Sequence, residues 1–110
     1  MFSETFEYTS CGEWHNLRAE DVLPYDTTTA LYKEYTAERE KHIVFSPRLR
    51  ELAAKLAAGE TNPYLKAKRI FRWINDHFPW ASAREYSTIE NIPEYVLDNR
   101  HGDCGQVSLL

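Results

Sequence analysis

The residues best suited to chemistry in this sequence surround Cys104, in the run GDCG at positions 102–105. A nucleophilic cysteine reacts as its thiolate, and the start of a helix favours that form through unpaired N–H groups and the helix dipole. Asp103 is placed to cap such a helix, and the first-turn N–H groups can stabilise an oxyanion. The flanking glycines let the backbone turn sharply and leave access for a substrate carbonyl. A buried, inert cysteine that packs like a small hydrophobic residue fits the same run equally well.

Histidine is the usual partner of such a thiol, and the sequence has four, all before Cys104: His15, His42, His77 and His101. His101 lies three residues from Cys104, but its place ahead of the helix suits a loop or hydrogen-bonding role. The pairs Cys11-x3-His15 and His101-x2-Cys104 could bind zinc, although such pairs usually sit on tight knuckles and these have dissimilar flanks. We expect no metal and no other cofactor. A disulfide between Cys11 and Cys104 has no support in the sequence.

The elements that must position Cys104 are predicted to be helices. Ser46-Pro47 is a cap followed by proline at the first helical position, and Gly59 ends that helix. Asn62-Pro63 repeats the start signal, and Pro79 ends the second helix. Two apolar stripes at helical spacing should pack together as an αα-hairpin. These stripes are Leu49, Leu52, Ala53, Leu56 and Ala57, then Ala67, Ile70, Phe71, Ile74 and Phe78.

A polar connector follows Trp80 and leads to a third, shorter helix from Ile92 to about Asn99, capped by Asn91. The sequence CGQVSLL (104–110) then opens a new helix. Seven residues are fewer than the roughly 12 to 15 that even a marginal isolated helix needs. We therefore expect the chain to end inside an element.

The first 44 residues differ in character. The run ETFEYTS (4–10) alternates weakly, and LPYDTTTALYKEYT (23–36) is rich in the Thr and Tyr that favour strands. We predict an extended arm or strands over residues 1–44, with a short helical turn from Ala37 to Lys41 as the alternative there, and a helical part over residues 45–110.

Composition limits the functions open to the chain. Its 110 residues are 43% hydrophobic, which is enough for a packed core. The net charge of -4 argues against nucleic acid, and the basic run 66–69 with Arg72 is interpreted as a solvated helix face. No apolar run approaches the roughly 20 residues of a membrane span. The start lacks the features of a signal peptide. The sequence does not determine the cellular compartment, and a larger protein that is exported or periplasmic is one alternative.

From Asn62 to Leu110 the sequence resembles the start of a bacterial transglutaminase-like domain. The stretch NPYLKAKRIFRWINDHFPW (62–80) is similar to the family's helix that ends in an aromatic residue. The connector and short helix SAREYSTIENIPEYVLDNR (82–100) also resemble that family. The sharpest similarity is HGDCGQVSLL (101–110), which resembles the G-x-C signature that opens the family's central catalytic helix. Residues 1–61 carry no such motif.

The resemblance implies an α+β parent domain with a papain-like Cys-His-Asp core, of which this mainly α-helical chain would be a truncated N-terminal part. It implies that Cys104 attacks the acyl carbon of a glutamine side chain or a peptide bond and forms a thioester. The family's histidine and aspartate follow the cysteine on strands of a downstream sheet. None of the four histidines has that placement, so we expect this chain alone to be inactive.

Related folds place an upstream polar or aromatic side chain beside the nucleophile as an oxyanion donor. The Trp80 indole N–H could act in this way, although a residue that covers the core below the helix end fits Trp80 as well. Tyr86 and Tyr95 are expected to be packing residues. The resemblance implies a protein or peptide substrate and favours hydrolysis over crosslinking. Exposed apolar faces make self-association plausible, and the alternative function is a non-catalytic binding or structural module with an inert cysteine.

Overall fold

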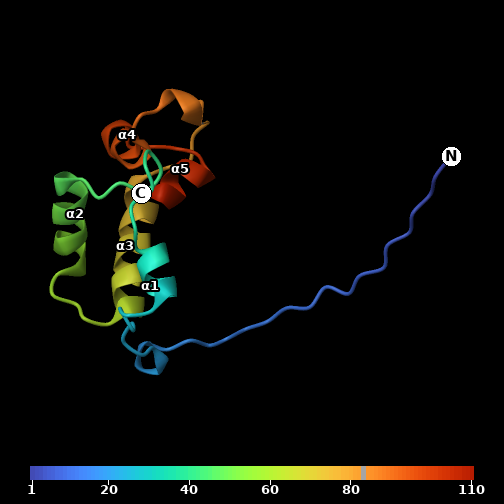
Figure 1. Ribbon diagram of the computed structural model, residues 1–110, viewed down its shortest axis with the longest axis horizontal. Helices are drawn as coiled ribbons and strands as arrows, with labels where there is room; N and C mark the ends of the chain where they lie inside the picture. Colours follow the sequence, from blue (N-terminus) through green and yellow to red (C-terminus); the bar gives the residue numbers. More distant parts are fainter. Residues whose placement is uncertain (83) are drawn as a thin grey trace.

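The computed structural model describes residues 1–82 and 84–110. Over these residues it is mainly helical, which confirms the predicted fold class of the chain (Figure 1). Ala83, part of the predicted connector, lies outside the described residues. The α-helices are α1 (Ala30–Tyr35), α2 (Pro47–Ala57), α3 (Pro63–His77), α4 (Ile92–Asn99) and α5 (Cys104–Leu109), and two 3-10 turns span Ala19–Asp21 and Tyr86–Thr88.

Helix α2 begins and ends where its capping signals predict. The Ser46 hydroxyl accepts the N–H of Leu49 at 3.2 Å, which satisfies one of the unpaired donors of the first turn. At the other end Ala58 adopts the left-handed conformation, with φ of 45°, and Gly59 follows with φ of 75°. The predicted glycine stop is thus confirmed, although the left-handed turn already begins at the alanine before it.

The later helices are also capped as predicted. The Asn62 side chain accepts the N–H groups of Tyr64 and Leu65 at 3.0 and 3.2 Å and starts α3. The Asn91 side chain accepts the N–H of Glu94 at 3.1 Å and starts α4. The bounds of α4 match the predicted helix.

Helices α2 and α3 lie side by side as the predicted hairpin (Figure 1). Leu49 and Leu52 of α2 and Ile74 of α3 pack against the core as expected. Phe71 does not, because its side chain is 70% exposed, and Trp73 packs against the core instead. At about 100° per residue, a face centred between Ile70 and Trp73 leaves Phe71 about 130° from that centre, on the side of the helix away from the core. The predicted stripe was therefore rotated too far, and Ala67 is exposed for the same reason.

The core lies around α4, which packs against α5. Ile92 and Val96 of α4 are fully buried, and Leu97, Ile89 and Phe78 complete the buried cluster. Tyr86 and Tyr95 are half-buried and pack against this cluster, which confirms that both are packing residues. Arg48 of α2 also reaches α4, where its guanidinium binds Glu94 at 2.9 Å and Asp98 at 2.6 Å.

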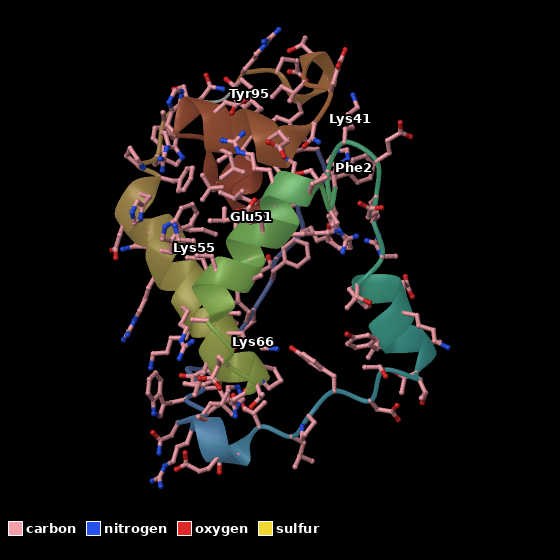
Figure 2. The ribbon with its side chains drawn as sticks, turned by 90° about the vertical axis from the view of Figure 1, so that its left-hand side faces the viewer. Phe2, Lys41, Glu51, Lys55, Lys66 and Tyr95 are labelled. Carbon is pink, nitrogen blue, oxygen red and sulfur yellow. The ribbon has the colours of Figure 1, made fainter. Side chains whose placement is uncertain are left out.

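The N-terminal region differs from its prediction over residues 30–35. This segment was expected to be extended, but it forms α1, because the Thr29 hydroxyl accepts the N–H of Tyr32 at 3.1 Å and caps a helix there. Local capping thus outweighs the strand preference of Thr and Tyr. The two views together show α1 standing apart from the α2–α3 hairpin (Figures 1 and 2). The alternative of a helical turn over Ala37 to Lys41 is also wrong.

A tight turn lies there instead, closed by an antiparallel bridge between Arg39 and Ile43. The Lys41 carbonyl accepts the N–H of Ile92 at 2.9 Å and attaches this turn to the start of α4. Figure 2 shows Lys41 at the α4 end of the molecule.

Residues 1–18 contain no helix or strand, and every one of them is solvent-exposed. Figure 1 shows this segment running away from the helices as an extended arm. The arm joins the helical part at the turn Ala19–Asp21, where the Ala19 carbonyl accepts the Asn62 side-chain N–H at 2.8 Å. Among the described residues, no helix combines the length and apolar character needed to cross a membrane.

Candidate active site around Cys104

Cys104 is the first residue of α5, as its sequence context predicts. The Asp103 carboxylate caps this helix, because its Oδ1 accepts the N–H of Gln106 at 2.8 Å. The Cys104 thiol is free and its residue is solvent-exposed. This contradicts the interpretation of Cys104 as a buried packing residue and leaves an accessible sulfur at a helix start.

The first turn of α5 has fewer N–H groups available than the sequence suggested. The Asp103 side chain takes the N–H of Gln106, and the Asp103 carbonyl accepts the N–H of Val107 at 3.0 Å. The N–H of Gly105 also interacts with the Asp103 carboxylate. The Cys104 N–H is therefore the first-turn group best placed to stabilise an oxyanion.

Trp80 is brought to the same place by the backbone. Trp80 and Gly102 form a parallel bridge, in which the Gly102 carbonyl accepts the N–H of Ala81 at 3.0 Å. This bridge sets Trp80, the third residue after the end of α3, beside the segment that leads into Cys104. The Trp80 side chain is 70% exposed, so the idea that it covers the core is wrong.

Tyr86 has a second role that the sequence did not reveal. Its hydroxyl donates a hydrogen bond to Asp103 Oδ1, the same oxygen that caps α5. This bond and the charge of Asp103, together with burial, raise the pKa of Tyr86. The N–H of Gln106 and the Tyr86 hydroxyl in turn lower the pKa of Asp103. The two side chains are seventeen residues apart in the chain, so no local pattern could have paired them.

Gln106 is the other residue that sequence reasoning missed. It is 1% exposed, and its side-chain N–H donates to the Arg84 carbonyl at 3.2 Å, which fastens α5 to the connector. A Cβ atom at Gly102 would lie 3.1 Å from both Cβ and Oε1 of Gln106. Gly102 therefore packs so closely against α5 that a larger residue there would require Gln106 to shift. Burial of a glutamine at this position has no signature in the sequence alone.

The four histidines lie in different surroundings. His15 belongs to the exposed arm. The Nδ1 atom of His42 lies 3.2 Å from the Glu40 carbonyl. The corresponding atom of His77 lies 2.7 Å from the Trp73 carbonyl, and the two rings stack at 4.9 Å. His101 is half-buried in the segment before α5.

The structure does not unite the two pairs once considered as zinc ligands. Among the described residues, no three side chains of His, Cys, Asp or Glu are grouped to hold a metal ion. Cys11 lies in the exposed arm and its thiol is free, as is that of Cys104. The structure therefore shows no bridge between these two cysteines.

Comparison with known proteins gives a match over the part of the chain that contains Cys104. No curated protein and no solved structure matches it. Residues 50–110 match the family model of the transglutaminase-like superfamily, a stretch that includes α3, α4 and the start of α5 at Cys104. Because this stretch is more than half of the 110 residues, the chain belongs to the transglutaminase-like superfamily.

Proposed function

We propose that Cys104 is the nucleophile of a reaction that proceeds through a thioester: hydrolysis of an amide or peptide bond, or acyl transfer to an amine. The observation that carries the proposal is an exposed free thiol on the first residue of a capped helix, within the stretch that matches the superfamily. Helix starts favour thiolates, and exposure gives a substrate access to the sulfur. Its substrate class is a protein or peptide, and hydrolysis is preferred over crosslinking.

The chemical steps follow from this assignment. The sulfur of Cys104 bonds to the acyl carbon, the carbon–nitrogen bond breaks, and the nitrogen leaves as an amine that takes up a proton. Water or an amine then attacks the thioester carbon and releases the Cys104 sulfur. The Cys104 N–H, and the Trp80 indole N–H as a second donor, are proposed to stabilise the oxyanion.

A complete cycle also needs a base for the thiol proton, and none of the four histidines is assigned this role. The family resemblance implies a histidine and an aspartate that follow the cysteine. We therefore propose that the 110 residues by themselves can be acylated at Cys104 by an activated ester, but do not turn over an amide substrate.

Acylation provides the test. The protein is treated with p-nitrophenyl acetate, and the modified residue is located by peptide mass spectrometry. The expected product is an acetyl group on Cys104 that hydroxylamine removes, as it does from thioesters. Cys104→Ser should lose this adduct, while Cys11→Ser should keep it. Acetylation confined to lysines, or equal at Cys11 and Cys104, would contradict the proposal.

A second candidate function is a non-catalytic binding or structural module. The observation that favours it is a groove of about 730 Å³ between the segment Ile43–Phe45, helix α2 and the end of α5, lined largely by apolar side chains. Such a surface suits a peptide or a second copy of the chain. On this account Cys104 stays unacylated, and sedimentation measurements show association that weakens when Phe45 is replaced by Glu.

A further inference from the structure

The hydroxyl of Tyr86 is held between the core and the first turn of α5. It donates to Asp103 Oδ1, which also accepts the N–H of Gln106 at 2.8 Å. The rest of Tyr86 is half-buried and packs against the core cluster. One carboxylate oxygen therefore connects a core side chain to the turn that carries Cys104.

Gly105 shows how closely this hydroxyl approaches the backbone next to Cys104. A Cβ atom at Gly105 would overlap the hydroxyl oxygen of Tyr86 and would lie 3.3 Å from the Cζ of its ring. The φ angle of Gly105 is not positive, so glycine is not needed here for a left-handed turn. Its lack of a side chain instead makes room for Tyr86.

We propose that Tyr86 is a positioning residue for Cys104: by binding Asp103, its hydroxyl fixes the first turn of α5 and moderates the negative charge beside the thiol. The inference rests on the proposed function, because it concerns how the Cys104 sulfur is kept reactive. The single hydroxyl proton of Tyr86 is used in the hydrogen bond to Asp103, so Tyr86 is not assigned the role of acid or oxyanion donor.

The electrostatic effect on Cys104 comes from its neighbour Asp103. A carboxylate next to a thiol disfavours the thiolate, because the two negative charges repel. Hydrogen bonds from Gln106 and Tyr86 spread the Asp103 charge and weaken that repulsion. The hydrogen bond to Asp103 is the largest cause of the raised pKa of Tyr86, and the charge of Cys104 acts in the same direction. The Tyr86 hydroxyl therefore stays protonated near neutral pH and keeps its donor.

Several charged side chains of the neighbouring segments have partners away from this turn. Arg84 donates to the Thr88 hydroxyl at 3.0 Å, and the Arg100 guanidinium lies over the Phe78 ring at 5.9 Å from its centroid. On the packed helix α4, the acidic residues Glu94 and Asp98 both bind Arg48. His101 is half-buried only three residues before Cys104, so its effect must be separated by a variant.

The experiment measures iodoacetamide labelling of Cys104 relative to Cys11 in the same molecule, from about pH 5 to about pH 9. Cys11 lies in the exposed arm and serves as an internal reference thiol. Tyr86→Phe should slow Cys104 roughly threefold to tenfold near neutral pH, the scale of one lost hydrogen bond, and move the midpoint of its profile to higher pH. Tyr95→Phe is the matched control, because Tyr95 packs against the same core, and it should change neither quantity.

Two further variants separate positioning from helix stability. Gly105→Ala raises helix propensity but displaces the Tyr86 hydroxyl, so we expect Cys104 to be labelled more slowly. If helix stability alone controlled the thiol, this substitution would not slow the labelling. Asp103→Asn removes the charge while keeping an acceptor oxygen for the cap. It should shift the profile to lower pH, and Tyr86→Phe added to it should then have little effect. His101→Gln should leave the Tyr86→Phe shift unchanged.

The outcomes distinguish this inference from the function on which it rests. If wild-type Cys104 reacts faster than Cys11 but Tyr86→Phe and Gly105→Ala leave the ratio unchanged, the positioning role is wrong and the nucleophile stands. If wild-type Cys104 is no faster than Cys11, the proposed function itself fails. Circular dichroism shows whether each variant is folded. If Tyr86→Phe does not fold, the labelling of Gly105→Ala tests the positioning role instead, because that substitution removes no core atoms.

Discussion

The two cysteines lie in regions that differ in what holds them. Cys104 begins α5, and its neighbour Asp103 is bonded both to the first turn and to Tyr86 of the connector. Cys11 lies in an arm of eighteen exposed residues without helix or strand. Both thiols are free and exposed, so exposure cannot separate them. We expect any difference in their reactivity to come mainly from the structure around Cys104.

The same contrast extends to the whole chain. Residues 46–110 hold a small core around α4, to which α2, α3 and α5 contribute side chains. Residues 1–45 form the short helix α1 and the turn closed by Arg39 and Ile43. This turn is joined to the helical part by the hydrogen bond from the Ile92 N–H to the Lys41 carbonyl. Stability should therefore depend on the second region and hardly on the first.

The largest expected effect comes from the centre of the core. Ile92→Ala removes a fully buried side chain, and we expect the free energy of unfolding to fall by about 2 to 5 kcal/mol in urea titrations. Phe6→Ala in the arm, where the ring is 78% exposed, should leave it unchanged. If Ile92→Ala fails to fold, Ile92→Val should still show a loss of about 0.5 to 1.5 kcal/mol. A loss at Phe6 equal to that at Ile92 would contradict the contrast.

An intermediate effect is expected at the helix caps. Ser46 caps α2 and also donates to Glu94, so Ser46→Ala should lower the free energy of unfolding by about 1 kcal/mol. Thr29 makes the matching cap on α1. Because α1 stands apart from the core, Thr29→Ala should reduce helical circular dichroism slightly and leave the unfolding midpoint in place. Equal shifts in that midpoint would show that α1 is part of the cooperative unit.

A smaller effect is expected in acid. The pKa of Asp103 is lowered by the N–H of Gln106 and the Tyr86 hydroxyl. Its contribution to stability is therefore complete above the unfolded value of about 3.9 and is lost as the pH falls through the lower folded value. Asp103→Asn should flatten this acid loss in thermal unfolding curves measured below about pH 4. The pKa of Asp26 is also lowered, by Thr28, but Asp26→Asn should change nothing, because its turn lies outside the core.

Much of the helical part could be predicted because its signals are local. Ser46, Asn62, Asn91 and Asp103 each cap a helix with a bond that spans two or three residues, so position in the sequence is enough to find them. The position of Cys104 at the start of α5 followed from the same kind of signal.

The remainder depends on contacts that neighbouring residues do not encode. Phe71 and Trp73 are both apolar residues of α3, and only the packing of the helices around the core decides which one faces it. The bond between Tyr86 and Asp103, and that between Gln106 and Arg84, join residues far apart in the chain. For α1 the sequence does contain a helix-start signal, because Thr29 is the N-cap. The prediction missed this helix because the surrounding Thr and Tyr residues favour strands.

The most direct test of the central claim compares Cys104 with Cys11 in folded and unfolded protein. Both are labelled with limiting iodoacetamide near neutral pH, once in buffer and once in concentrated urea, and the labelled peptides are quantified by mass spectrometry. The account predicts that Cys104 reacts faster than Cys11 in the folded protein and that the ratio falls to about one on unfolding, because the start of α5 no longer exists. A folded-state ratio at or below one would contradict the assignment of Cys104 as a nucleophile.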